Sequence, residues 1–243
     1  MGKIARDHIA YGPPISSTSI ILDNASGPGI ILGEILAQSA SIGTPKLYAM
    51  DISPVMIEML QKKKWPGVES EVMDAQALTY SDNKFTHIFM SMGIFLLPDP
   101  EKGAKEMYRT LQPGGAVVVS SIKQIGWVTI FQAAQMEVKP ESPLFKSPLK
   151  EEWSTKEKLI SVLEAGGFKA ADIEIKVGES SIPSNELELL MRSMRGPVTG
   201  MITGTWTEEE KGRFEVALDK QMEKEMKNPR ELEVVYWIAI AKK

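Results

Sequence analysis

The chain has 243 residues, a formal net charge of −4 at pH 7 and 43% hydrophobic residues, the composition of an ordinary soluble globular protein. It contains no cysteine and two histidines, which excludes disulfides, thiolate chemistry and histidine-rich metal sites, and makes most hydrolase mechanisms unlikely on inventory alone. The acidic balance argues against a nucleic-acid partner, and since neither a span of about 20 apolar residues nor a signal-peptide core is evident, we expect a cytoplasmic protein without a membrane partner.

Short apolar segments alternate with helical ones in the first half of the chain. The expected strands are Ser19–Asp23, Lys46–Asp51, Val68–Asp74, Phe85–Met92 and Ala116–Ile122. The expected helices begin near Ile30, Pro54, Ala75 and Pro100. Ser53-Pro54 and Asp99-Pro100 each place a capping residue before a proline at the first helical position. Alternation of this kind requires a parallel sheet with right-handed crossovers and helices on both faces.

The second half of the chain has a different pattern. Residues 139–153 are typical of a loop, and Ser154-Thr155-Lys156-Glu157 offers a capping box for a helix that Gly166-Gly167 ends. The remaining expected elements are a strand at Phe168–Val177, two helical pieces within residues 185–227 and a strand at Leu232–Ala241. Two strands around a helical insertion indicate a terminal pair that includes an antiparallel strand.

The loop after the first expected strand is the most specific signal in the sequence. Ile20-Ile21-Leu22-Asp23 is an apolar run that ends in an acid, and Asn24-Ala25-Ser26-Gly27-Pro28-Gly29 leads from it into a helix. Gly27 and Gly29 can adopt positive φ and let a ligand approach the backbone, and the helix directs its free N–H groups at the loop. The third glycine is Gly33, so the spacing is GxGxxxG and differs from the GxGxxG of dinucleotide sites. We therefore predict a nucleotide-sized pocket here.

Three further positions lie where expected strands end. Asp51 ends the second strand, where a carboxylate can accept both hydroxyls of a ribose. Asp74-Ala75 ends the third, where an acid and a small neighbour can meet an adenine edge. Met90-Ser91-Met92-Gly93 ends the fourth. Ligands of open α/β sheets bind at the carboxyl ends of the strands, so these positions are expected to share one site.

With these motifs the chain resembles the class I S-adenosylmethionine-dependent methyltransferases. The resemblance runs through Leu22–Gly29, Tyr48–Ser53, Val72–Ala75, Phe85–Phe89 and Tyr108–Gly115. The Leu-Asp-Asn-Ala opening, Gly126-Trp127 and Trp206–Glu209 are similar to fungal secondary-metabolite members such as the gliotoxin thiomethyltransferases. The resemblance implies a Rossmann-like, doubly wound α/β fold. Its seven-stranded sheet would have the order 3-2-1-4-5-7-6, with the seventh strand antiparallel and a helical insertion.

The resemblance also implies S-adenosylmethionine as the cofactor. By position, the implied cofactor-binding residues are Asp23, Ala25, Gly27, Gly29, Asp51, Ile52, Met56, Asp74, Ala75, Ser91 and Met92. Asp23 would line the methionine end, Asp51 would hold the ribose and Ile52 would pack on the adenine. Ser91 and Met92 would flank the sulfonium.

Two features depart from the family pattern. Ala25 stands where many members have a glycine, and alanine is tolerable there only with negative φ. Only about 18 residues precede the first expected strand, whereas family members often carry further helices there that close over the cofactor. We therefore expect either a shortened start or a different lid arrangement, with His8 and Tyr11 as the aromatic lid candidates at this end. We expect one domain over residues 1–243. Its expected parts are a segment to residue 18, a cofactor-binding core over 19–125, substrate-binding helices and loops over 126–230, and a terminal strand over 231–243.

The expected function is methyl transfer to an oxygen, sulfur or nitrogen atom of a small secondary metabolite. The implied substrate-binding residues are Phe95, Trp127 and Phe131, with Trp153 beside them and a cap of methionines near Met191, Met194 and Met201. No general base is evident, which favours an acceptor with an acidic proton, such as a thiol. The sequence assigns neither a catalytic residue nor an oligomeric state.

Other functions remain open from the sequence. A nicotinamide-dependent oxidoreductase shares the first strand, loop and helix and the ribose acid, whereas the glycine spacing and the terminal strand pair count against it. A member of the fold that does not methylate, such as a pericyclase, would have the same cofactor pocket. A scaffold protein would leave that pocket unused. An assay for methyl transfer separates these alternatives.

Overall fold

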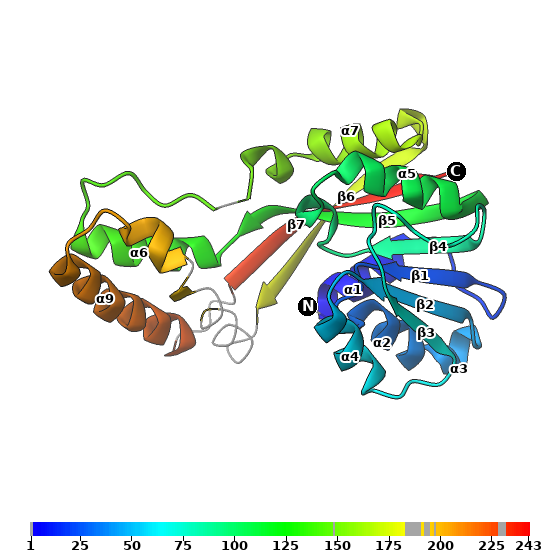
Figure 1. Ribbon diagram of the computed structural model, residues 1–243, viewed down its shortest axis with the longest axis horizontal. Coiled ribbons are helices and arrows are strands. Elements are labelled where there is room, and N and C mark those ends of the chain that lie inside the picture. Colours follow the sequence, from blue (N-terminus) through cyan, green and yellow to red (C-terminus); the bar gives the residue numbers. More distant parts are fainter. Residues whose placement is uncertain (1, 148, 183–190, 192–194, 197, 228–231) are drawn as a thin grey trace. The chain divides into compact units, whose positions relative to one another are not determined.

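The computed structural model describes the chain apart from residues 1, 148, 183–190, 192–194, 197 and 228–231 (Figure 1). The contacts divide the chain into two compact units, and the single domain over residues 1–243 stays a prediction. Unit 1 comprises residues 1–123, 151–178 and 236–243, and unit 2 comprises residues 124–150 and 179–235. Residues 151–178, expected among the substrate-binding elements, thus belong to the unit that contains the first strands of the sheet.

The strands form one seven-stranded sheet in the order β3-β2-β1-β4-β5-β7-β6, which confirms the predicted order. The strands are β1 (Ile20–Asn24), β2 (Lys46–Asp51), β3 (Val68–Val72), β4 (Phe85–Met90), β5 (Leu111–Ile125), β6 (Ile173–Ile182) and β7 (Leu232–Lys242). β1 pairs in parallel with both β2 and β4, and β4 pairs in parallel with β5. At one end of β5, Gly114 N–H donates to the Lys243 carbonyl and Lys243 N–H donates to the Gly115 carbonyl. Just beyond the other end of β5, Gly126 N–H donates to the Glu233 carbonyl, near the start of β7. β5 and β7 therefore run in opposite directions, so β7 is antiparallel as predicted.

The helices begin largely where the capping residues predict. They are α1 (Gly2–Tyr11), α2 (Ile30–Ala37), α3 (Ser39–Ile42), α4 (Pro54–Gln61), α5 (Pro100–Thr110), α6 (Trp127–Val138), α7 (Lys156–Gly166) and α9 (Glu208–Lys227). Short 3₁₀ turns lie at η1 (Ile94–Leu96), η2 (Glu151–Ser154) and η3 (Ala170–Asp172). The side chains of Ser53 and Asp99 accept the N–H groups of the first turns of α4 and α5, as the sequence predicts.

Three expected elements differ from the structure. The strand expected at Ala116–Ile122 is the longer β5, which begins at Leu111 and ends at Ile125. The helix predicted from Ala75 is a turn, because the Arg109 guanidinium donates to the carbonyls of Leu78 and Tyr80 and so engages backbone acceptors that a helix would use internally. The strand predicted from Phe168 begins at Ile173, because η3 intervenes.

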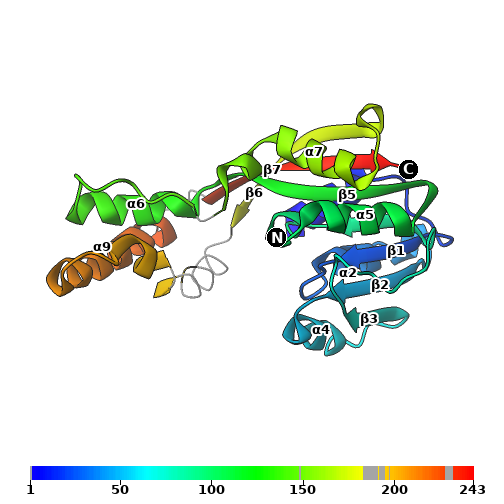
Figure 2. The ribbon, with the colours of Figure 1, turned by 45° about the horizontal axis from the view of Figure 1, so that its top comes forward.

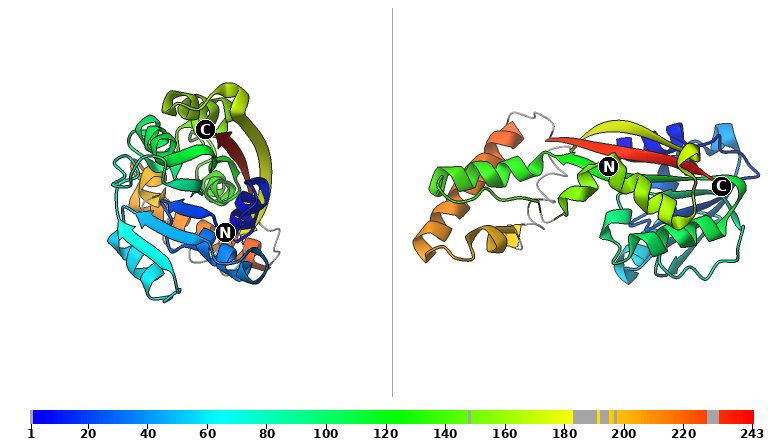
Figure 3. Two further views of the ribbon diagram at one scale, coloured as in Figure 1. Left: turned by 90° about the vertical axis from the view of Figure 1, so that its right-hand side faces the viewer. Right: turned by 90° about the horizontal axis from the view of Figure 1, so that it is seen from above.

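Helices cover both faces of the sheet in unit 1 (Figures 2 and 3). α5 and α7 lie on one face, where a hypothetical Cβ on Gly166 would collide with Ala104. α1 and α2 pack together on the other face. The buried core between sheet and helices on the α5 side includes Leu22, Met50, Ile88, Met90, Val117, Val119, Met107, Leu159 and Leu163. This arrangement leaves the carboxyl ends of the parallel strands free to form a site.

Residues 2–11, expected as part of a short leading segment, form the packed helix α1. Ile4, Ala5 and His8 are buried on one side of it, and Tyr11 is 39% exposed. His8 Nδ1 lies 2.7 Å from the Ile4 carbonyl, and burial lowers the pKa of His8 to about 4, so the imidazole is neutral. His8 is therefore part of the helix packing.

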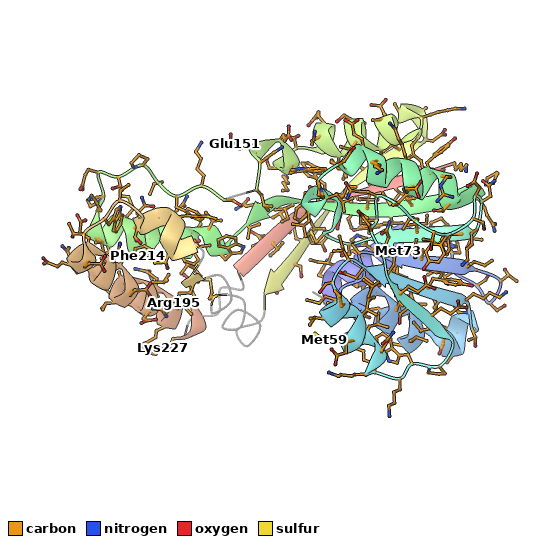
Figure 4. The ribbon with its side chains drawn as sticks, in the orientation of Figure 1. Met59, Met73, Glu151, Arg195, Phe214 and Lys227 are labelled. Carbon is orange, nitrogen blue, oxygen red and sulfur yellow. The ribbon has the colours of Figure 1, made fainter. Side chains whose placement is uncertain are left out.

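Unit 2 has a core of its own between α6 and α9. Its buried residues include Trp127, Ile130, Phe131, Phe145, Trp206, Phe214 and Leu218. Thr207 and Glu210 exchange hydrogen bonds at the start of α9, the reciprocal pattern of a capping box. Arg195 donates to Glu215 over 2.6 Å and to Asp219 over 2.7 Å, both on α9, and Figure 4 labels Arg195 and Phe214. No helix among the described residues is both long and apolar enough to cross a bilayer.

Candidate functional site

The loop between β1 and α2 is folded back in a left-handed conformation. The φ angles of Ala25, Gly27 and Gly29 are 55°, 52° and 81°. Ser26 N–H donates to the Met50 carbonyl over 2.9 Å, which fixes the loop to the end of β2. The φ of Gly29 favours glycine, and a Cβ there would also crowd the end of the Leu60 side chain, whose methyl carbon would lie 2.8 Å away. The positive φ expected of both glycines is confirmed.

The conformation of Ala25 differs from the prediction that alanine is tolerable at this position only with a negative φ. Its φ is positive, which costs a residue with a Cβ about 1–2 kcal/mol relative to the right-handed region. Tertiary contacts explain why the conformation persists: the loop is bound to β2 through Ser26, and the Ala25 methyl lies close to Gly93. A Cβ on Gly93 would approach the Ala25 Cβ to 3.0 Å, so the loops after β1 and β4 pack directly on each other.

Asp51 at the end of β2 is held by the backbone around it. One carboxylate oxygen accepts the Gly27 N–H over 2.8 Å and the other accepts the Ser53 N–H over 2.9 Å. Each oxygen retains acceptor capacity for a further donor. Ile52 next to it is 67% exposed, and Met56 is half-buried in the first turn of α4. This end of β2 thus presents a fixed carboxylate beside an accessible apolar side chain.

Asp74 follows β3 and is fixed by a turn. Its carboxylate accepts the Gln76 N–H over 2.8 Å and the Gln76 side-chain amide over 3.0 Å. The first of these bonds and then the second lower the pKa of Asp74, which is therefore ionised at neutral pH. Gln76 also accepts the Asp99 N–H over 2.8 Å, while Ala75 between them is buried.

A pocket of about 120 Å³ lies against the glycine loop. Its lining residues are Ala5, Asp23, Ala25, Ser26, Gly27, Pro28, Ile30, Ile31 and Ser91. Of the residues predicted for the methionine end, Asp23, Ala25 and Gly27 meet here, and Ser91 joins them from the chain after β4. Ala5 of α1 is a lining residue that the sequence analysis missed. The apolar spacing of Ile4, Ala5 and His8 is the signal that could have identified it.

Asp23 is buried in this pocket without a countercharge. Its side chain is 1% exposed, and its Oδ2 has no hydrogen-bond partner among the described residues. Burial raises its pKa well above the usual range, the Leu32 N–H at the start of α2 partly opposes the rise, and the negative charge of Asp51 adds to it. The surroundings of Asp23 therefore favour its protonated form.

The chain after β4 reaches the pocket through Ser91. Met92 has a φ of 56°, and its N–H donates to the Ser120 hydroxyl over 2.9 Å. Phe95 in η1 packs edge-on against Trp153 with ring centroids 6.3 Å apart. Both of these aromatic residues lie in unit 1.

The aromatic residues expected to line the substrate wall are divided between the two units. Trp127 and Phe131 contact each other and Phe145 in the core of unit 2, with Trp127 6% and Phe131 0% exposed. These two side chains therefore stabilise the pairing of α6 with α9. Among the expected cap residues, Met191 is buried, Met201 is exposed and Met194 lies outside the described residues.

Comparison with known proteins adds independent information. Residues 22–119 match the model of a family described as a methyltransferase domain. The chain is 30% identical over 225 residues to methyltransferase ucsB of Acremonium sp, covering 86% of this chain and 76% of that protein. It is 29% identical over 229 residues to acetylaranotin bis-thiomethyltransferase of Aspergillus terreus, covering 88% and 77%. The structure is similar to that of Haemonchus contortus phosphoethanolamine N-methyltransferase 2 in complex with S-adenosyl-L-methionine, with a TM-score of 0.56, 17% identity and coverage of 99% and 52%.

Proposed function

Because this chain belongs to the methyltransferase family, we propose that it methylates a thiol of a small secondary metabolite, with S-adenosylmethionine as the methyl donor. Methyl transfer from S-adenosylmethionine is the activity of the family, and the thiol acceptor is the part that we add. The observation that carries the proposal is the arrangement of Asp23, Asp51 and Asp74 at the carboxyl ends of three neighbouring strands, beside a left-handed glycine loop. Membership of this family leaves no support for the nicotinamide-dependent oxidoreductase.

The residues of this edge fit S-adenosylmethionine. The unpartnered Oδ2 of Asp23 lies in a pocket with no cationic side chain among its described lining residues, so an ammonium group would satisfy it. Gly27 leaves open space, because a Cβ there would meet no described atom within 4 Å. Asp51 would hold the ribose with its remaining acceptor capacity, and the exposed Ile52 would cover the adenine beside Asp74.

The residues of the chain bind and align the reactants. A bound S-adenosylmethionine supplies a methyl group on a positively charged sulfur, which a nucleophile displaces in line. Ser91 and Met92 would border that sulfur, and the hydrogen bond between Met92 N–H and Ser120 fixes their backbone. Ala5 of α1 covers the pocket wall and helps to exclude water. Alignment and exclusion of water are what this transfer demands of a protein.

The acceptor is inferred from the ionisable groups at the pocket. Asp23 is the ionisable side chain among the described lining residues, and the ammonium group of the cofactor would occupy its unpartnered oxygen, so Asp23 would not serve as a base for the acceptor. An acceptor with a pKa near 8.5, such as a thiol, supplies its own thiolate near neutral pH, whereas an unactivated hydroxyl needs a base. The resemblance to acetylaranotin bis-thiomethyltransferase supports the same acceptor.

Calorimetric titration with S-adenosylhomocysteine tests the cofactor site, with NADH as the comparison ligand. We expect S-adenosylhomocysteine to bind and Asp51→Ala to weaken it at least tenfold, since this removes a fixed acceptor and frees the N–H groups of Gly27 and Ser53. Asp172→Ala, which removes an exposed acid in η3, is the matched control and should bind normally. Binding of NADH in its place would contradict the proposal.

Methyl transfer itself is tested with a labelled methyl donor and paired acceptors. Small cyclic dithiols and the corresponding diols differ in the acceptor atom alone. We expect label in the dithiol products and little in the diols. Transfer to the diols at an equal rate would refute the thiol assignment while leaving the methyltransferase activity in place. Absence of transfer to any acceptor, together with tight cofactor binding, would favour a non-methylating protein such as a pericyclase.

A further inference from the structure

We propose that Ser120 of β5 is a positioning residue for the cofactor: its hydroxyl holds the turn after β4 in the shape that places Ser91 on the pocket wall. The inference rests on the proposed function, because it concerns the same pocket. It assigns a role to a fully buried side chain that neither lines the pocket nor was singled out by the sequence analysis.

The hydroxyl acts where the backbone ladder stops. Pairing between β4 and β5 ends at Met90 and Val119. Beyond this pair, Met92 N–H donates to the Ser120 Oγ over 2.9 Å. A side chain of β5 thus takes the place of a backbone acceptor and directs the chain after β4 out of the sheet. Because Ser120 has no exposed area, water cannot substitute for the hydroxyl without repacking.

The turn that this bond holds is intrinsically unfavourable. Met92 is in the left-handed region with a φ of 56°, a conformation that residues with a Cβ persist in only when their surroundings impose it. The next residue, Gly93, has its Cα against the Ala25 methyl, since a Cβ there would lie 3.0 Å from the Ala25 Cβ. A displaced turn would therefore disturb both Ser91 and Ala25, on two sides of the same pocket.

The neighbouring serine is a matched control. Ser121 is on the same strand, is equally buried, and donates its hydroxyl to the Trp153 carbonyl over 2.8 Å. Trp153 is not among the pocket residues. Loss of either hydroxyl removes one buried hydrogen bond, so the two variants are expected to lose similar stability. Loss of the Ser120 hydroxyl alone would alter the pocket.

The experiment compares Ser120→Ala, Ser120→Cys and Ser121→Ala in the full chain. Titration with S-adenosylhomocysteine should show about tenfold weaker binding for both Ser120 variants and a change below twofold for Ser121→Ala. The cysteine fills the serine's volume with a weak acceptor, so equal losses with alanine and cysteine separate the hydrogen bond from a cavity effect. Amide hydrogen exchange at Met92 should accelerate in the Ser120 variants and stay unchanged in Ser121→Ala.

A second substitution, Met92→Gly, tests whether strain at Met92 causes the weaker binding of Ser120→Ala. Glycine adopts positive φ without strain, so in the Met92→Gly background Ser120→Ala should weaken binding by less than threefold. Equal weakening in both backgrounds, normal binding by Ser120→Ala, or equal losses for Ser120→Ala and Ser121→Ala would each overturn the inference. If the unmodified protein fails to bind S-adenosylhomocysteine, the proposed function fails and the inference falls with it. Normal binding by the unmodified protein and by Ser120→Ala refutes the inference alone.

Discussion

The buried acid of the pocket should make the stability of this protein depend on pH, and Asp23→Asn should remove that dependence. Asparagine has nearly the shape of the protonated acid, so the variant keeps the packing of a side chain that is 1% exposed. Its amide cannot ionise. The comparison therefore isolates a single titrating group.

The sign of the effect follows from the direction of the shift. Burial raises the pKa of Asp23 in the folded protein, so between the unfolded and the folded pKa the native state holds one more proton than the unfolded state. The stabilising contribution of protonated Asp23 is fully present below its unfolded pKa of about 3.9 and is lost as the pH rises through its folded pKa. His8 acts in the opposite direction, because burial lowers its pKa to about 4 and its contribution grows as the pH rises toward 6.5.

One proton corresponds to about 1.4 kcal/mol per pH unit in the free energy of unfolding. His8 is common to both proteins, so the difference between them reports Asp23. For each pH unit over which Asp23 is protonated in the folded protein and ionised in the unfolded one, the variant should gain about 1.4 kcal/mol relative to the wild type. The gain comes entirely from the ionisation that the unfolded wild type undergoes and the native wild type resists.

Urea unfolding of both proteins at half-unit pH steps measures this difference, and the slopes against urea should remain equal. The ¹³Cγ chemical shift of Asp23 reports its protonation directly in the same pH range. A constant difference between the two proteins, or an Asp23 signal that ionises near pH 4, would refute the raised pKa of Asp23.

Three further changes test the packing around the site. Ala25→Gly should raise the free energy of unfolding by about 1 kcal/mol, because glycine has no penalty at a φ of 55°, and a lower melting temperature would contradict the strain. Gly166→Ala should lower the free energy of unfolding by about 1–3 kcal/mol in urea, since the added methyl would collide with the backbone of Ala104. An unchanged urea midpoint would contradict the close contact of α5 with α7. Arg109→Met should lower the free energy of unfolding by about 2 kcal/mol, because the carbonyls of Leu78 and Tyr80 and the Glu106 carboxylate lose their donor. It should also speed amide exchange in residues 76–82, and unaltered exchange would show that Arg109 does not stabilise the turn.

The sequence was sufficient for most of the sheet. The alternation of apolar strands with capped helices requires parallel pairing through right-handed crossovers, and the resemblance supplied the strand order and the antiparallel last strand. The sequence also predicts a site at one edge of the sheet, because Asp23, Asp51 and Asp74 each lie at or just after the end of a strand. These features are local or follow from connectivity, which is why they can be predicted from the chain alone.

Other features depend on contacts between distant segments. The helix predicted at Ala75 is instead a turn, whose Tyr80 and Leu78 carbonyls accept hydrogen bonds from Arg109, 29 and 31 residues later in the chain. Phe131 could have faced either a substrate or a core, and α9 decided this by burying it. Ala25 looked restricted to negative φ, and packing against Gly93 gave it the opposite sign.

The sequence by itself determined most of the strands and helices, because strand and helix patterns and short capping motifs are set by neighbouring residues, and it predicts the edge of the sheet at which a methyl donor would bind. Only the tertiary structure decided which polar groups at that edge are buried and which groups they contact. The raised pKa of Asp23 depends on its burial at a pocket that residues of α1 and α2 line, and the bond from Met92 N–H to Ser120 depends on β4 and β5 lying side by side. Burial and hydrogen bonding between distant residues have no counterpart in a local sequence pattern, and they set the chemistry of this site.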